Sequence, residues 1–143
     1  MRRPYYQLHT PEGITFANLF WHQQENQNAM LKSGMYDGFK SEGTKITPAD
    51  DPKLMSYHIQ QMVSEIGEVL SSDNRWKNFR NQKFDRDNKL EEIADCFIVM
   101  MNVAMYSGFD ASEVVEAITA KLNKVTERVN AHNVAVSTWG AGD

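Results

Sequence analysis

Two pairs of acidic residues lie where a protein core is expected. Glu65 and Glu68 belong to one largely apolar stretch, and Glu92 and Asp95 belong to another. Side chains three residues apart lie on one face of a helix, about one turn from each other. Because burying an unpaired carboxylate costs several kcal/mol, each pair must face a cation, a basic side chain or water.

The chemistry that suits such acids is the binding of a hard metal ion. Four carboxylates meeting between two helices would raise one another's pKa and repel. Mg²⁺ removes this conflict, since it prefers oxygen ligands and commonly binds carboxylates on one side and substrate phosphates on the other. Two alternatives stay open, namely acids on solvated helix flanks and an internal network of ion pairs with Lys and Arg.

The helices that carry these acids are expected to be buried. The third helix, over about 87–106, is apolar nearly all round, which is typical of a buried helix. Glu92, Asp95 and Asn102 form one polar stripe about 80° wide on it. On the second helix Glu65 projects within the apolar arc and Glu68 lies at its edge.

The rest of the chain is expected to be helical too, because no alternating run is long enough for a strand. A first helix is predicted over about 10–33, beginning near Thr10, Pro11 and Glu12. A loop over 34–51 and the motif-bearing helices over 52–130 follow. The fourth helix is expected to begin at Asp110 and end near Asn130, and the tail over 131–143 to fray.

Composition excludes several classes of protein. The 143 residues predict one domain, and 41% apolar with 24% charged residues excludes a disordered chain. The longest near-apolar run, from Ile93 to Met105, is too short and too polar for a membrane span, and no secretory signal is expected. A single cysteine, Cys96, excludes an internal disulfide and a cysteine-based zinc site, and favours a reducing, cytoplasmic setting. The net charge of −4 argues against nucleic acid as a partner.

The two acidic motifs together resemble a known signature. Glu65-Ile66-Gly67-Glu68 and, farther along the chain, Glu92-Ile93-Ala94-Asp95 are similar to the paired motifs of the all-α nucleoside triphosphate pyrophosphohydrolases. This superfamily includes MazG, the dCTP pyrophosphatases and the dimeric dUTPases. Asn102 is similar to an asparagine of MazG proteins, the stretch Glu116–Lys124 to the family's next helix, and Asp73–Lys77 to a Trp/Phe-Lys segment of the dimeric dUTPases.

The resemblance covers about Ser56 to Arg128, roughly half the chain, and it has departures. Ser64 stands where MazG proteins usually carry an acid, and the dimeric dUTPases are larger than this chain. The segment 1–50 matches no family segment. The resemblance therefore leaves the subfamily open.

The resemblance implies a fold and a reaction. The fold would be all-α, a four-helix-bundle-like MazG-type domain over 1–143, assembled as a homodimer or homotetramer. Mg²⁺, or alternatively Mn²⁺, would be held by Glu65, Glu68, Glu92 and Asp95. Water would attack the α-phosphorus of a nucleoside triphosphate, giving the monophosphate and pyrophosphate, with Glu65 orienting or deprotonating the water. Such an enzyme would clean the nucleotide pool, with a mild preference for dUTP or dCTP.

Other side chains are candidates for substrate binding. A basic stripe on the fourth helix could bind phosphates, or it could be a solvated face near a helix C-terminus. It consists of Lys121, Lys124 and Arg128. Lys77 could also meet phosphates, and Trp76 could stack on the base or belong to the core. Asn102 could bind sugar or base, or cap a buried polar network. His58 could support Glu65 from an earlier turn of the same helix, although a lone histidine is more often structural.

Three rival functions stay open. A di-iron protein of the ferritin type would need Glu-x-x-His motifs, and neither acidic pair ends in His. A non-catalytic helical module could bind nucleotide or protein without turnover. A related hydrolase could act on another diphosphate or on a modified nucleotide.

Overall fold

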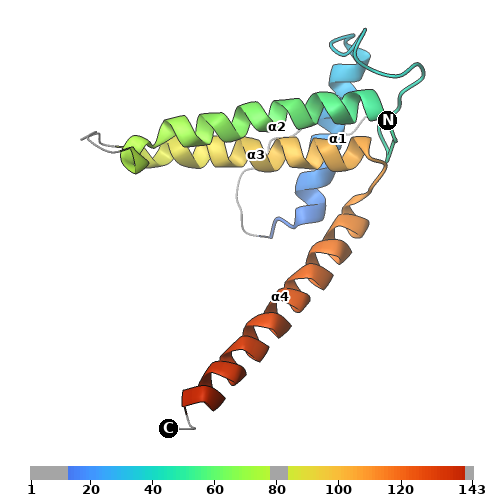
Figure 1. Cartoon of the computed structure of the whole chain (residues 1–143). Helices are drawn as coiled ribbons and strands as arrows, with labels where there is room; N and C mark the ends of the chain where they lie inside the picture. Colours follow the sequence, from blue (N-terminus) through green and yellow to red (C-terminus); the bar gives the residue numbers. More distant parts are fainter. Residues whose placement is uncertain (1–12, 78–83, 141–143) are drawn as a thin grey trace. The chain divides into compact units, whose positions relative to one another are not determined.

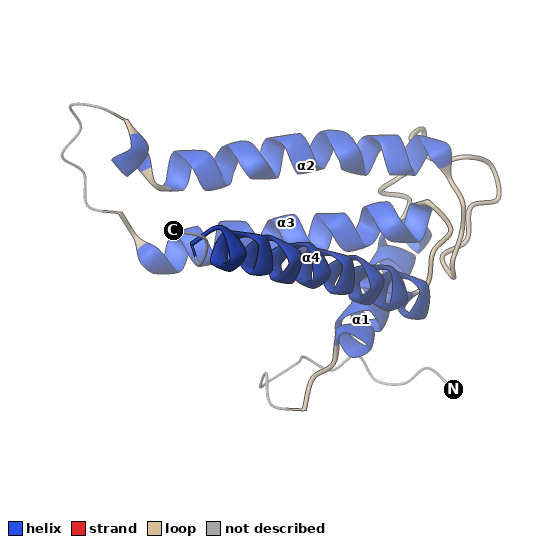
Figure 2. Cartoon of the chain, turned by 60° about the horizontal axis from the view of Figure 1, so that its bottom comes forward, coloured by secondary structure: helices blue, strands red, loops and turns tan. Residues whose placement is uncertain are grey.

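The computed structural model describes residues 13–77 and 84–140, with side chains to 134. These residues form four α-helices and one short 3₁₀ turn, with no strand among them (Figures 1 and 2). The all-α prediction is thus confirmed. No helix in the described ranges is long and apolar enough to span a membrane. The elements are α1 (Phe16–Lys32), α2 (Pro52–Ser72), η1 (Asn74–Trp76), α3 (Arg86–Tyr106) and α4 (Ala111–Gly140).

The chain divides into two compact units, Met1–Asp110 and Ala111–Asp143, and each is described by itself. In the first unit α2 and α3 lie side by side and run in opposite directions, and α1 contacts α3 (Figures 1 and 2). The second unit contains α4. The expectation of one domain and of a homo-oligomer stays a prediction.

Side-chain caps explain where three of the helices begin. Thr15 caps α1 through a reciprocal pair of hydrogen bonds with Asn18, each 3.2 Å long. The predicted start near Thr10 is therefore wrong, because 13–15 precede the helix, and Thr10, Pro11 and Glu12 lie outside the described residues. Asp51 caps α2 and Asp85 caps α3, and both helices begin and end close to the predicted bounds.

The fourth helix is longer than the sequence analysis predicted. It continues to Gly140, well past the expected end at Asn130. No glycine or proline occurs between Asn130 and Trp139, so the sequence lacks a stop signal there. The prediction of a fraying tail is wrong for 131–140, and 141–143 lie outside the described residues.

One buried carboxylate organises the long loop before α2. Asp51 is 1% exposed and accepts hydrogen bonds from the backbone N–H groups of Lys53 and Leu54, at 3.0 and 3.1 Å. It also accepts from the N–H and hydroxyl of Ser41, at 2.9 and 3.0 Å, and from the Thr44 hydroxyl. Burial alone would raise the pKa of Asp51, but these donors outweigh it and lower the pKa.

The core is small, aromatic and located where the loop meets one end of the α2–α3 pair. Tyr36, Leu54 and Tyr106 are buried together with Ile46. The side-chain carbonyl of buried Gln27 accepts hydrogen bonds from the hydroxyls of Tyr36 and Tyr106, both at 2.7 Å. These bonds tie α1 and the loop to the C-terminal end of α3.

The prediction of a buried third helix holds for only part of α3 within the first unit, and its cover by a second chain stays a prediction. Its buried residues are Val99, Met101, Asn102, Met105 and Tyr106, all in the C-terminal half. Leu90, Phe97 and Met100 are exposed by 56%, 69% and 53%. Two helices side by side cover only their facing sides, so the outer apolar positions of α3 stay open to solvent.

His58 is buried among aromatic rings. It is 3% exposed, and its ring stacks on Tyr106 with centroids 5.2 Å apart, while Tyr36 and Tyr57 meet it edge-on. Its Nδ1 lies 3.5 Å from the amide nitrogen of Asn102, and its Nε2 has no hydrogen-bond partner among the described residues. Burial lowers the pKa of His58 from its ordinary 6.5 to about 4.

The Asp51→Ala variant should lose both the α2 cap and the anchor of the loop. We expect a fall of at least about 2 kcal/mol in the free energy of unfolding, because several buried donors lose their acceptor. Urea unfolding measures this change. Asp85→Ala is the matched control, since Asp85 only caps α3 and its loss should cost about 1 kcal/mol. Equal losses in the two variants would contradict the anchoring role.

His58 should make the protein sensitive to acid. Because its pKa is lower in the folded chain, the unfolded chain binds more protons between pH 6.5 and about 4, and stability falls as pH falls through that window. His58→Phe keeps a ring against Tyr106 but cannot bind a proton. Melting temperatures from pH 8 to 4 should therefore fall less steeply for the variant, and identical slopes would exclude His58 as the cause.

Candidate metal centre

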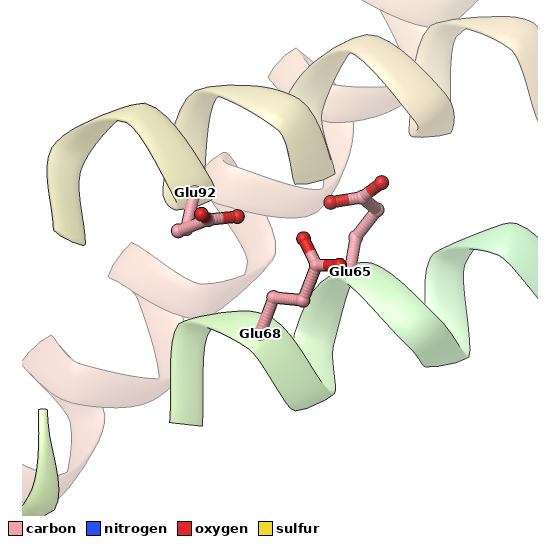
Figure 3. Close-up of side chains that lie close together, drawn as sticks. All are labelled: Glu65, Glu68 and Glu92. Carbon is pink, nitrogen blue, oxygen red and sulfur yellow. The ribbon is translucent and has the colours of Figure 1, made fainter. Parts of the chain in front are cut away.

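Three of the four predicted metal ligands meet between α2 and α3. Glu65 and Glu68 project from α2 toward Glu92, which projects from α3 (Figure 3). One carboxylate oxygen from each residue lies within 4.8 Å of the others. Glu65 and Glu92 are partly buried, whereas Glu68 is exposed.

The fourth predicted ligand, Asp95, lies outside this group of three. It is exposed and sits one turn beyond Glu92 on α3. Its charge still reaches the group, because it helps to raise the pKa of both Glu65 and Glu92. Asp95 is therefore a neighbour of the three-carboxylate cluster of Glu65, Glu68 and Glu92 (hereafter the carboxylate cluster), and its role as a ligand stays a prediction.

The helix pairing explains why these acids meet. The backbone N–H of Asp51 donates a 2.9 Å hydrogen bond to the carbonyl of Tyr106, which joins the start of α2 to the end of α3. Asp51 and Glu65 are separated along α2 by as many residues as Glu92 and Tyr106 are along α3. In antiparallel helices that rise about 1.5 Å per residue, both acids then reach the same level, about 21 Å from the joint.

Two oxygens of the carboxylate cluster are buried without a partner. Glu65 Oε2 and Glu92 Oε2 have no hydrogen-bond donor in the described parts of the chain. The ion pairs found there join Asp73 to Arg75 and Lys89, and none involves the cluster. Within 13–77 and 84–134, the alternative of an internal ion-pair network is thus not observed.

The environment of the carboxylate cluster raises the pKa of two of its acids, Glu65 and Glu92. Burial raises the pKa of Glu65, and the charges of Glu68 and Asp95 add to this effect. The pKa of Glu92 is raised by its contact with Glu68, by burial and by the neighbouring negative charges. The pKa of the nearby Cys96 thiol is raised first by burial and then by the same acids, which favours an inert thiol.

Trp76 and Lys77 lie together beyond the end of α2. The Trp76 indole is 58% exposed and donates a 3.3 Å hydrogen bond to the Leu70 carbonyl, and the Lys77 ammonium lies 5.3 Å from the ring centre. Trp76 is therefore not a core residue in this unit. Its accessible ring and the adjacent cation leave stacking and phosphate binding chemically available, and both roles stay predictions.

Sequence reasoning missed the residue that holds this segment. Asp73 is 8% exposed and binds Arg75 Nη2 at 2.8 Å and Lys89 Nζ at 2.9 Å, which links the end of α2 to α3. The Arg75 and Lys89 side chains lower the pKa of Asp73. Its position at the end of a helix, with a basic residue two positions later, was the available signal.

Asn102 and His58 belong to the interior of the first unit. Asn102 is 4% exposed, and its carbonyl oxygen accepts a 2.9 Å hydrogen bond from Gln23 of α1. This is the buried polar network that was one of its two predicted roles. His58 contacts Asn102 and the aromatic core, so no described contact joins it to Glu65.

The predicted phosphate ligands of the fourth helix lie in the second unit. Lys121, Lys124 and Arg128 are on the exposed surface of α4, and so are apolar residues of the same helix. Those apolar residues are Val115, Ile118, Leu122, Val125 and Val129. The role of the three cations stays a prediction.

Comparisons with models of protein families, with curated proteins and with solved structures find no match to this chain. The resemblance to the pyrophosphohydrolases therefore stays a prediction.

Glu65→Gln should stabilise the metal-free protein at neutral pH. Since the pKa of Glu65 is raised above its ordinary 4.5 by folding, the folded chain binds more protons, and stability falls as pH rises through the raised pKa. We expect the variant to melt a few degrees higher at pH 7.5 in EDTA, with a smaller advantage at pH 5. Glu91→Gln removes an exposed acid outside the carboxylate cluster and should change the melting temperature little. A lower melting temperature for Glu65→Gln would contradict the repulsion.

Proposed function

We propose that this protein is a Mg²⁺-dependent nucleoside triphosphate pyrophosphohydrolase. The observation that carries the proposal is the carboxylate cluster, in which two helices bring three carboxylates within 4.8 Å and two buried oxygens have no donor among the described residues. Such oxygens gain most from a cation, because a buried acceptor without a partner is costly.

The donor set favours a hard ion. All three groups supply carboxylate oxygen, and no histidine or cysteine among the described residues joins the carboxylate cluster. Oxygen ligands suit Mg²⁺ or Mn²⁺, whereas zinc and iron sites usually include nitrogen or sulfur. The ferritin-type di-iron alternative gains no support from this arrangement.

The proposed reaction is hydrolysis at the α-phosphorus. When bound, Mg²⁺ would neutralise the triphosphate and lower the pKa of a bound water. Glu65 would accept a proton from the attacking water, a role that suits a carboxylate whose pKa is raised above its ordinary value. The oxygen of water would bond to the α-phosphorus, the bond to the bridging oxygen would break, and monophosphate and pyrophosphate would leave.

Substrate recognition and assembly complete the proposal. Lys77 would bind phosphate and Trp76 would stack on the base, with a pyrimidine deoxynucleotide such as dUTP or dCTP preferred. Lys121, Lys124 and Arg128 would supply further phosphate contacts, and Asp95 a further metal ligand. A homodimer or homotetramer would cover the exposed apolar residues of α2 and α3, such as Val63, Ile66 and Phe97. A cytoplasmic role in cleaning the nucleotide pool fits this chemistry.

The direct test offers each common NTP, each dNTP and dUTP with Mg²⁺ and measures pyrophosphate and orthophosphate separately. We expect pyrophosphate with the matching monophosphate. Glu65→Gln and Glu92→Gln should each lower turnover by about 100-fold or more, as loss of a catalytic acid–base group or metal ligand does. Glu91→Gln should retain turnover.

Metal binding is tested separately by melting. Mg²⁺ at about 100 times its dissociation constant should stabilise the protein by about 2.7 kcal/mol, and the Glu92→Gln variant should lose most of that gain. Metal binding without turnover would favour the non-catalytic module or a modified substrate. Orthophosphate as the sole product would place hydrolysis at another phosphorus, and no metal effect would remove the basis of the proposal.

A further inference from the structure

A concave site lies apart from the carboxylate cluster, between the last turns of α1 and the loop that leads to α2. The pocket has a volume of about 350 Å³. Its lining residues are Asn28, Leu31, Lys32, Lys40, Thr44, Lys45 and Ile46. A volume in this range suits a small molecule.

All the charged residues that line the pocket are positive. Three of the seven lining residues are lysines and none is acidic. The ion pairs found in the described ranges join Asp73 to Arg75 and Lys89, so Lys32, Lys40 and Lys45 have no carboxylate partner there. A concave surface lined by one sign of charge concentrates its field and attracts ligands of the opposite sign.

The three lysines come from two elements of the chain. Lys32 lies in the last turn of α1, where a cation is favourable because of the helix dipole. Lys40 and Lys45 come from the loop and share the pocket with this last turn of α1. An anion bound in the pocket could therefore contact ammonium groups from both elements.

The loop lysines stand on a fixed backbone. Asp51 accepts hydrogen bonds from Ser41, which follows Lys40, and from Thr44, which precedes Lys45. Ile46 is 4% exposed and belongs to the core. Holding the neighbours of both lysines in place lowers the entropy that binding would otherwise cost.

The pocket and the carboxylate cluster are separate sites. The pocket lies beside the start of α2, because its loop residue Thr44 is bonded to Asp51. Glu65 lies farther along α2, at a separation from Asp51 that corresponds to about 21 Å of helix. Leu31 and Ile46 add apolar surface and Asn28 adds an amide, so the lining can contact both a charged group and a neutral part of a ligand.

We propose that this lysine-lined pocket binds a small phosphorylated molecule with at least two negative charges. Lysine ammonium groups bind phosphate oxygens as point charges. This proposal does not depend on the proposed hydrolase activity, because none of its residues belongs to the carboxylate cluster.

The test is titration calorimetry of the full chain with inorganic pyrophosphate in EDTA at low salt. We expect one site, and the Lys40→Gln/Lys45→Gln variant should bind at least about 10-fold more weakly. The matched control is Lys53→Gln/Arg86→Gln, which removes two exposed charges outside the pocket. That control and Glu65→Gln should bind as the native chain does.

Three outcomes would overturn the proposal. The first is the absence of pyrophosphate binding. The second is equal weakening of binding in the control variant, which would mean that overall charge attracts the ligand. The third is loss of binding in Glu65→Gln, which would place the ligand at the carboxylate cluster. Circular dichroism and melting of each variant separate a lost site from a lost fold. These outcomes can be interpreted even if the hydrolase assay fails, since EDTA removes any metal-dependent reaction.

Discussion

The structure of the first unit depends on the junction at Asp51. Its carboxylate caps α2 and anchors the loop at Ser41 and Thr44, and its backbone N–H binds the carbonyl of Tyr106 at the end of α3. A single residue thereby sets the start of one helix against the end of the other. Because both helices are regular, this junction also sets which side chains meet several turns away, namely Glu65 and Glu92.

The two ends of the α2–α3 pair differ in how well their polar groups are paired. At the junction, aromatic rings and the Gln27 carbonyl satisfy one another, and Tyr106 is completely buried. At the other end, carboxylates repel and two oxygens lack donors among the described residues. The favourable packing at the junction offsets the cost of bringing the acids together.

The exposed apolar residues and the lysine-lined pocket are surfaces of two different chemical kinds. Side chains such as Val63 on α2, Phe97 on α3 and Leu122 on α4 are more than half exposed. Exposed apolar patches of this kind often mark interaction surfaces. The pocket differs in character, since its charge favours a small anion and its walls are built from a loop and a helix end.

The sequence by itself determined the helices and the chemistry that they carry. Capping residues and apolar spacing predicted α2 and α3 closely, and the i, i+3 spacing predicted that acids would share a helix face. These features are local, so short segments encode them. The start of α1 and the end of α4 were predicted wrongly because Thr15 competes with Thr10 as a cap and no stop signal follows Asn130.

Only the tertiary structure decided which residues meet. The pairing of α2 with α3 brought Glu92 to Glu65 and left Asp95 outside the group, and it directed Asn102 and His58 into the interior. It also left much of α3 exposed, although its apolar sequence predicted burial. Burial and side-chain partners depend on contacts between distant segments, and a helical period carries no information about which neighbour covers each face.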